Sequence, residues 1–308
     1  MRRFLPTILL VVLCVGGFWY AKSQSFFKPN NPKAEQKLVS IDVVDVKGFS
    51  INLRGEIVQL DKNDGSWAMS KPAAYPIDKY SPDNWIGAFV DLVYVSKIDD
   101  QPDNIASFGL DKPSQQYQIT LKDGSVKKLL IGKSLPVPGN SYAKLDDAPA
   151  VYEVSDKTLQ GLQRMPIDFL DTAALSFQYE KIKSLSVEWK GDKWLLEKVE
   201  ANKTTYDTKW KIGSLELKPA DGMALLNKMM NIRTEELVKP ATEVKVEAPE
   251  LKVEIKQDDK GKEVVTSYVG KVDKDDIWIL NQGGSWAYKI PVVLVQDLYE
   301  NGKNPAKQ

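Results

Sequence analysis

The sequence predicts an α+β protein made of two tandem copies of an antiparallel-sheet-plus-helix unit, preceded by one N-terminal transmembrane helix. Three observations lead to this prediction. Short segments that alternate between apolar and polar residues are separated by glycine turns, a pattern typical of antiparallel strands. Two segments with helical spacing of apolar residues each begin at a proline. Landmarks of the first half also recur in the second half in the same order.

The recurrence rests on four pairs of landmarks at a nearly constant offset of about 136 to 143 residues. The pairs are Trp67 and Trp210, Pro113 and Pro249, Gly132 and Gly270, and Leu162 and Leu298. Their members are turn prolines, strand residues and helix residues, so the repeat concerns the fold and not a shared chemistry. We expect one topology for both units, with Gly132 and Gly270 at equivalent strand ends.

The chain begins with a candidate membrane anchor. Arg2 and Arg3 precede an apolar run over residues 4–21, and about 18 residues suffice to cross a bilayer core. Aromatic residues close the run, where their rings suit the headgroup level, and the two arginines predict a cytoplasmic N-terminus. We therefore expect residues 1–22 to anchor a body that lies outside the cytoplasm. A signal peptide cleaved near Ala21-Lys22-Ser23 is the alternative.

The rest of the chain divides into three parts. Residues 23–37 are polar and contain two prolines, so they are expected to be a spacer between membrane and body. Residues 38–176 form the first predicted α+β repeat unit, and residues 177–308 form the second.

In the first unit, the clearest segment is the turn Phe108-Gly109-Leu110-Asp111-Lys112-Pro113 with the strand pair that follows it. A helix is predicted from Pro82 to about Ser96, with Ser81 as its capping residue. A second, short helix is predicted from Ser155 to Met165. The expected strands lie near residues 39–46, 51–53, 57–60, 67–69, 116–121, 126–131, 142–145 and 151–154.

In the second unit, a helix is predicted from Pro219 to about Ile232, and a last helix from Val292 to Tyr299. The expected strands lie near residues 182–189, 194–199, 210–212, 251–255, 264–269, 278–280 and 286–290.

Composition excludes several classes of function. Lys+Arg and Asp+Glu both number 42, so the net charge is zero and no basic excess points to nucleic acid. Histidine is absent, and the single cysteine, Cys14, lies in the apolar N-terminal run. The body therefore has no Ser-His or Cys-His nucleophile and no disulfide. Leu13 stands where a lipoprotein signal needs a small residue before its cysteine.

Two motifs resemble ligand sites but lack essential parts. Gly132-Lys133-Ser134 resembles the end of a phosphate-binding loop, but Lys127 stands where that motif needs glycine. Asp273, Asp275 and Asp276 resemble a calcium loop but lack its central glycine and its distal glutamate. We expect a strand end and a solvated turn, respectively, and assign no catalytic, cofactor-binding or metal residue.

Other side chains leave alternatives open. Trp85 and Phe89 are expected to pack in the core at their helical spacing, with an aromatic binding ledge as the alternative. Most of the eight tryptophans are expected in the core, although an exposed one could stack on a sugar or a protein partner. Paired carboxylates could serve a glycosidase without histidine, but no motif selects a pair. Asn202-Lys203-Thr204 fits a glycosylation acceptor, a pattern too short to weigh.

Several pieces of the first unit resemble a bacterial family, domain of unknown function number 4340. They are Trp67-x-Met69-x-Lys71-Pro72, Phe108-Gly109-Leu110-Asp111-x-Pro113, Leu130-Ile131-Gly132 and Tyr142-Ala143. The second unit departs from the family's turn and keeps only its proline, Pro249. The resemblance implies a membrane-tethered extracytoplasmic protein, often encoded beside an ABC-type transporter, and it implies no catalytic residues.

The sequence thus leads to the expectation of a non-enzymatic accessory or scaffold protein in the cell membrane, with its C-terminal body outside the cytoplasm. Its expected partner is another envelope protein, such as an ABC-type transporter, with no role for nucleic acid or a cofactor. The alternative is a cell-wall glycan binder or a carboxylate-based glycan hydrolase.

Overall fold

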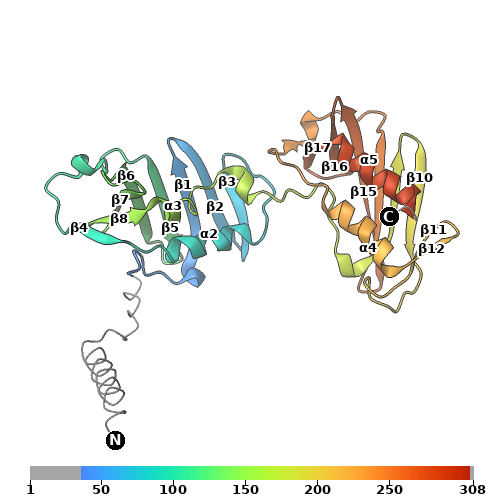
Figure 1. The fold of residues 1–308 in the computed structure, drawn as a ribbon, viewed down its shortest axis with the longest axis horizontal. Helices are drawn as coiled ribbons and strands as arrows, with labels where there is room; N and C mark the ends of the chain where they lie inside the picture. The colour runs from blue at the N-terminus through green and yellow to red at the C-terminus, as the bar shows by residue number, and fades with distance from the viewer. Residues whose placement is uncertain (1–35, 306–308) are drawn as a thin grey trace, which may run out of the picture.

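A computed structural model describes residues 36–305 of the protein. These residues form an α+β structure with two antiparallel sheets, which lie in two lobes joined by one segment of chain (Figure 1). The predicted anchor at residues 1–22 and nearly all of the predicted spacer fall outside the described residues. Within the described part, no helix is long and apolar enough to span a membrane.

The first sheet has eight strands in the order β3-β2-β1-β5-β6-β7-β8-β4. Its strands are β1 (Val46–Leu53), β2 (Glu56–Asn63), β3 (Ser66–Lys71), β4 (Ser96–Asp99), β5 (Gln115–Leu121), β6 (Val126–Ser134), β7 (Asn140–Leu145) and β8 (Val151–Ser155). The helices of this lobe are α2 (Ser81–Val90) and α3 (Asp156–Leu159).

The second sheet has nine strands in the order β12-β11-β10-β9-β14-β15-β16-β17-β13. Its strands are β9 (Ile182–Trp189), β10 (Asp192–Lys198), β11 (Trp210–Ile212), β12 (Leu215–Leu217), β13 (Lys239–Pro240), β14 (Leu251–Asp259), β15 (Lys262–Asp273), β16 (Asp276–Asn281) and β17 (Trp286–Pro291). Its helices are α4 (Pro219–Met230) and α5 (Val292–Lys303).

The two sheets follow the same strand order once β1, β2, β3 and β5 are matched with β9, β10, β11 and β14, except that the edge strand β12 of the second sheet has no counterpart in the first. The registers agree as well. Leu53 faces Glu56 and Gln115 on its two neighbouring strands, and Trp189 faces Asp192 and Leu251 in the same way. Matching residue by residue from these positions, Pro113 and Pro249 stand equally far before their strands. The short edge strands β4 and β13 also correspond, and neither was predicted.

The first core lies between the sheet and α2. Phe49 of β1 stacks on Trp85 of α2 with ring centroids 4.3 Å apart, and Phe89 is fully buried beside them. The ring nitrogen of Trp85 donates to the carbonyl of Leu162, at 3.0 Å. Trp85 and Phe89 are therefore core residues, as their helical spacing predicted, and not an exposed binding ledge.

In the second lobe, α4 and α5 cover one face of the sheet (Figure 1). Trp210 is fully buried against Gly222 of α4, and Trp194 packs against Gly302 of α5. A methyl group on either glycine would lie 2.1 Å from the tryptophan ring, so only glycine permits these contacts. No α-helix of residues 36–305 covers the opposite face of this sheet.

Several predicted local features are wrong in detail. The helix α2 ends at Val90 and not near Ser96, because the chain turns at Asp91 to bury Leu92 and then enters β4. Ser81 does not cap α2, since the Asp78 carboxylate accepts its backbone N–H. Residues 39–45 form no long strand, because a short 3-10 turn covers residues 43–45 before β1 begins.

The second predicted helix, over residues 155–165, is also wrong in its extent. Only the four residues of α3 are α-helical, and Ser155 makes no capping hydrogen bond. The chain then turns at Gly161 and buries Leu159 and Leu162, which keeps the helix short while still closing the end of the core.

The expected equivalence of Gly132 and Gly270 is wrong by one residue. Gln115 faces Ile131 on β6, whereas its counterpart Leu251 faces Gly270 on β15. Gly270 therefore occupies the core-facing position of Ile131, since a shift of one residue moves a side chain to the other face of a sheet. Gly132 lies on the outer face, where the carbonyl oxygen of Phe108 would be 2.2 Å from a methyl group.

The segment between the lobes is hydrogen-bonded on both sides. The backbone N–H of Asp171 donates to Pro76 of the first lobe, and that of Thr234 in the second lobe donates to Thr172. Tyr75 and Trp286, one from each lobe, have ring centroids 5.5 Å apart. The division of the chain into domains at Ser176 stays a prediction.

Candidate functional site

The uncovered face of the second sheet is hollowed over its four central strands. A hollow of about 670 Å³ lies over β10, β9 and β14, and a second of about 260 Å³ extends toward β15. Both are lined by Ser186, Lys193 and Glu254, so they form one depression, which we call the charged trough. Its other charged lining residues are Glu180, Lys181, Lys183, Glu188, Glu197, Lys198, Lys252, Lys256, Asp258 and Glu263.

The floor of the trough is formed by two serines of β9. In this strand Leu185 and Val187 point into the core, so the alternating residues Ser184 and Ser186 point into the trough. Both serines are nearly buried, because longer side chains on β10 and β14 rise beside them. Neither hydroxyl has a hydrogen-bond partner within residues 36–305, so both remain available to a ligand.

Charged side chains on the walls of the trough form ion pairs across strands. The Nζ atom of Lys252 lies 2.7 Å from Glu188 on the facing strand, and that of Lys183 lies 3.0 Å from Asp258. The Nζ atom of Lys256 lies 3.7 Å from the carboxylate of Glu263 and 3.9 Å from that of Glu254 on its own strand. Such exposed pairs contribute little to stability, but they fix where each charge lies.

One carboxylate of the trough has a perturbed pKa. Asp258 accepts the backbone N–H of Gly261 at 2.7 Å and a salt bridge from Lys183, and these donors lower the pKa of its carboxyl group. The carboxylate is therefore charged at neutral pH and already satisfied, which suits a structural role in the β14–β15 turn and not proton transfer.

Lys193 differs from the other lysines along β9, β10 and β14. Its ammonium group makes no ion pair and no hydrogen bond within the described residues. It faces Glu188 across the strand pair, but the Glu188 carboxylate is paired with Lys252. Lys193 also lies diagonally beside Ser186, so one free cation and the two free hydroxyls lie at the centre of the trough.

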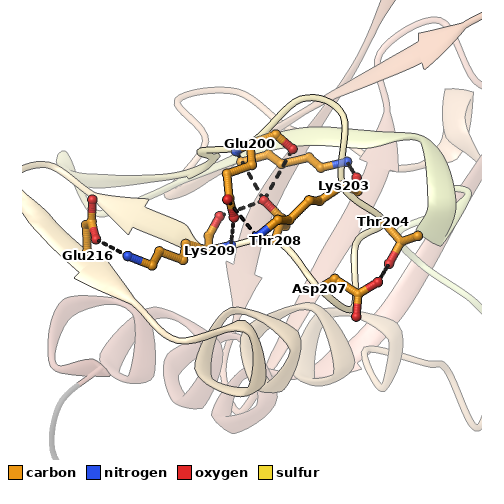
Figure 2. Close-up of polar contacts among 8 residues, drawn as sticks. Glu200, Lys203, Thr204, Asp207, Thr208, Lys209 and Glu216 are labelled. Atoms are coloured by element: carbon orange, nitrogen blue, oxygen red, sulfur yellow. Dashed lines mark hydrogen bonds and ion pairs between the residues drawn. The ribbon is translucent and has the colours of Figure 1, made fainter.

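The loop between β10 and β11 closes one end of the trough. Figure 2 shows its polar contacts: the Glu200 carboxylate pairs with Lys203 at 2.7 Å and accepts the backbone N–H of Lys209. These two donors lower the pKa of the Glu200 carboxyl group. Thr208 is fully buried and exchanges hydrogen bonds with the backbone of Glu200. The loop is thus held by its own side chains.

The same loop contains the glycosylation-like triplet. Asn202 is exposed at a turn, and the Thr204 hydroxyl donates to Asp207 at 2.7 Å (Figure 2). The triplet is therefore accessible, and two of its three side chains contribute to the structure of the loop.

The first sheet has a different chemistry at the same register positions. Glu188, Lys252 and Glu254 of the second sheet correspond to Asn52, Gln116 and Gln118 of the first. A fourth charged residue, Lys256, corresponds to Thr120, and Ser186 corresponds to Ser50. At these four charged positions the outer face of the first sheet is neutral, although Asp61 corresponds to the charged Glu197 of the trough.

The other residues singled out by sequence do not join the trough. Gly132-Lys133-Ser134 ends strand β6, and the ammonium group of Lys133 donates to the carbonyl of Ala106. Asp273 and Asp276 close the β15–β16 turn, where Asp276 pairs with Lys289. In residues 36–305, no group of three or more acidic, cysteine or histidine side chains is arranged to hold a metal ion.

The tryptophans are mostly structural. Of the seven in the described residues, four are buried, and the other three, Trp67, Trp278 and Trp286, are half-buried. Trp278 lies under the ammonium group of Lys239, and Trp286 contacts the ring of Tyr75. None of the seven lines the trough.

Sequence reasoning missed Ser184, Ser186 and Lys193. The alternation of β9 did contain a signal for the serines, because strand residues between core positions must face outward. Nothing in the sequence marked Lys193 as unpaired. Glu188 has a lysine opposite it on each neighbouring strand, Lys193 on β10 and Lys252 on β14, and only the structure shows that it pairs with Lys252.

Comparisons with known proteins identify the chain by family. Residues 67–248, more than half of the chain, match the family described as Domain of unknown function (DUF4340), and the protein belongs to this family. The match begins at β3 and ends just before β14, so it covers parts of both lobes. No curated protein and no solved structure matches the chain.

Proposed function

We propose that this protein is a membrane-tethered, extracytoplasmic accessory or scaffold protein that binds another envelope protein and catalyses no reaction. The charged trough is the observation that carries the proposal. It combines fixed ion pairs with free hydrogen-bonding groups on a sheet face that no α-helix of the described residues covers. Charges arranged in this way provide orientation and specificity toward a protein surface of complementary charge.

The location rests on the N-terminal sequence. The apolar run at residues 4–21 and the arginines before it support a retained anchor with the body outside the cytoplasm. The resemblance to the family supports an ABC-type transporter as the kind of partner. Protease added to cells stripped of their wall should digest the body of the full-length protein, and a body that stays protected would contradict this location.

The partner is tested by cross-linking in intact cells. A photo-reactive amino acid at Leu195, which lines the trough and is 37% exposed, should attach the protein to one specific membrane protein. The matched position in the first sheet is Gln59, because Leu195 faces Ser186 as Gln59 faces Ser50. If neither the Leu195 position nor the Gln59 position forms a cross-link to any envelope protein, the proposed function is refuted.

A second candidate function is glycan binding by the first sheet. Asn52, Gln116 and Gln118 present neutral side chains that can both donate and accept hydrogen bonds, as sugar hydroxyls require. The side chains of Gln116 and Gln118 have no partner within the described residues, whereas the Asn52 side-chain oxygen accepts the backbone N–H of Gly55 at 2.9 Å. Retention of the protein on purified cell-wall glycan, lost in a Gln116→Ala and Gln118→Ala double variant, would favour this second function.

The corresponding strand orders also support a common origin. We propose that the two units are tandem copies of one ancestral unit whose outer sheet faces have diverged, with Glu188, Lys252, Glu254 and Lys256 of the second sheet standing where the first has neutral residues.

A further inference from the structure

We infer that the charged trough binds an acidic, extended segment of the protein partner, with a carboxylate of that segment held between Lys193 and Ser186. The inference rests on the proposed function and deepens it, because it states the chemistry of the partner. Three observations carry it, namely which charges are already paired, where the free donors lie, and how the trough runs.

The first observation is the balance of paired and unpaired charges. The carboxylates of Glu188, Asp258 and Glu197 each lie within 3.2 Å of a lysine ammonium group. Glu263 and Glu254 share Lys256 at 3.7 and 3.9 Å.

Lys193 is the central lysine of the trough that has no such partner within residues 36–305. The carboxylate of Glu180 also has no ion-pair partner in the described part of the chain, but it stands at the Tyr179–Lys181 end of the trough, away from the serines. The unsatisfied charge at the centre is thus positive, and an anion is the complementary ligand.

The second observation is that the free groups at the centre donate hydrogen bonds. Ser186 is 6% exposed and Ser184 is 8% exposed, and neither hydroxyl has a partner within the described residues. A hydroxyl and an ammonium group side by side can share one carboxylate, which accepts through both of its oxygens. A cationic ligand could not satisfy all of these groups, because it would be repelled by the Lys193 ammonium group.

The third observation is the shape of the trough. Its two hollows share three lining residues and together cross four strands, from β10 to β15. A depression of this extent takes several residues of an extended chain. The flanking lysines Lys183, Lys252 and Lys256 already have partners, so they would guide an acidic segment without holding it as firmly as Lys193.

The test uses the full-length protein in detergent and a short fluorescent peptide of alternating Glu and Ser, followed by anisotropy at low salt. Its neutral counterpart has Gln in place of every Glu. We expect the acidic peptide to bind, the neutral one not to bind, and added salt to weaken binding. The variant Lys193→Gln should weaken binding of the acidic peptide about tenfold, and Ser186→Ala about threefold.

Lys112→Gln is the matched control, because it removes the same charge from an exposed lysine in the first lobe that has no partner in the described residues. It should leave binding unchanged. Equal binding of both peptides, no binding of the acidic peptide, or an equal loss in Lys112→Gln and Lys193→Gln would overturn the inference. If Leu195 still cross-links to a membrane protein in cells, such a result removes the inference and leaves the proposed function standing.

Discussion

The two lobes fill corresponding cores with aromatic rings from different elements. Trp67 and Trp210 occupy the same register position. Trp67 faces Lys62 of β2 and Trp210 faces Lys198 of β10, and these two lysines are at matched positions of the two sheets. Trp67 is half-buried and donates to Asp83 on the helix surface, at 2.9 Å. Trp210 is fully buried, and its ring nitrogen has no partner in the described residues.

The helices explain the difference. The first lobe places a large ring, Trp85, on its helix, where it stacks on Phe49 of β1. The second lobe has Leu185 at the position of Phe49 and brings Gly222 of its helix against Trp210. The comparison teaches that one sheet topology accepts large side chains from either layer, provided that the facing layer leaves room.

The largest expected effect separates the two matched tryptophans. Trp210→Ala should lower the free energy of unfolding by about 3 to 5 kcal/mol, because it opens a large cavity in a closed core. Trp67→Ala should lower it by about 1 to 2 kcal/mol, since this ring is partly in water. Urea unfolding, with hydrogen exchange read separately in peptides of each lobe, measures both. Equal losses would contradict the difference in burial.

The next prediction compares two helix glycines. Gly222→Ala should destabilise the second lobe by about 2 kcal/mol, because the new methyl group would lie 2.1 Å from the Trp210 ring. Gly87→Ala in α2 has open space around its methyl group and should stabilise the first lobe by about 0.5 to 1 kcal/mol. Thermal unfolding of both variants gives the signs, and a stabilising Gly222→Ala would show that α4 shifts freely.

A smaller effect distinguishes the matched outer faces of the two sheets. A double-mutant cycle on Glu188 and Lys252, each changed to alanine, should give a coupling energy of about 0.5 kcal/mol that vanishes in high salt. The same cycle on the matched pair Asn52 and Gln116 should give a coupling close to zero at any salt concentration. A salt-dependent coupling in the neutral pair would contradict the contrast between the faces.

The smallest predicted effect concerns pH and the two matched hairpin turns. The pKa of Asp258 is lowered by the backbone N–H of Gly261 and by Lys183, and that of Asp123 is lowered by Ser125. A carboxyl group with a lower pKa in the folded state stabilises the protein above its unfolded pKa, near 3.8. That stabilisation is lost as the pH falls through the folded-state value.

Asp258→Asn and Asp123→Asn should therefore each reduce the drop in melting temperature between pH 6 and pH 3. Added salt should diminish the effect more for Asp258, because part of its pKa shift comes from Lys183. Melting curves at both pH values and two salt concentrations test this. A larger salt response for Asp123 would contradict the assignment.

Local sequence was sufficient for most elements because their causes are local. Alternating residues and glycine turns predicted the strands, and prolines correctly located the beginnings of α2 and α4 within a residue. The end of α2 was missed because burial of Leu92 after the turn at Asp91 is a tertiary contact. The trough was missed for the same kind of reason, since its strands β9 and β14 lie about 60 residues apart in sequence.

The sequence by itself determined the α+β class, the repeated order of landmarks and the family. These follow from periodicity, turn chemistry and short motifs, which the chain carries locally. Only the tertiary structure decided register, and register set the functional surface. A one-residue shift put Gly270 in the core but Gly132 on the outer face. Strand pairing joined Glu188 to Lys252 and left Lys193 without an ion pair in residues 36–305. Pairing between distant strands depends on the whole sheet, so no local pattern contains it.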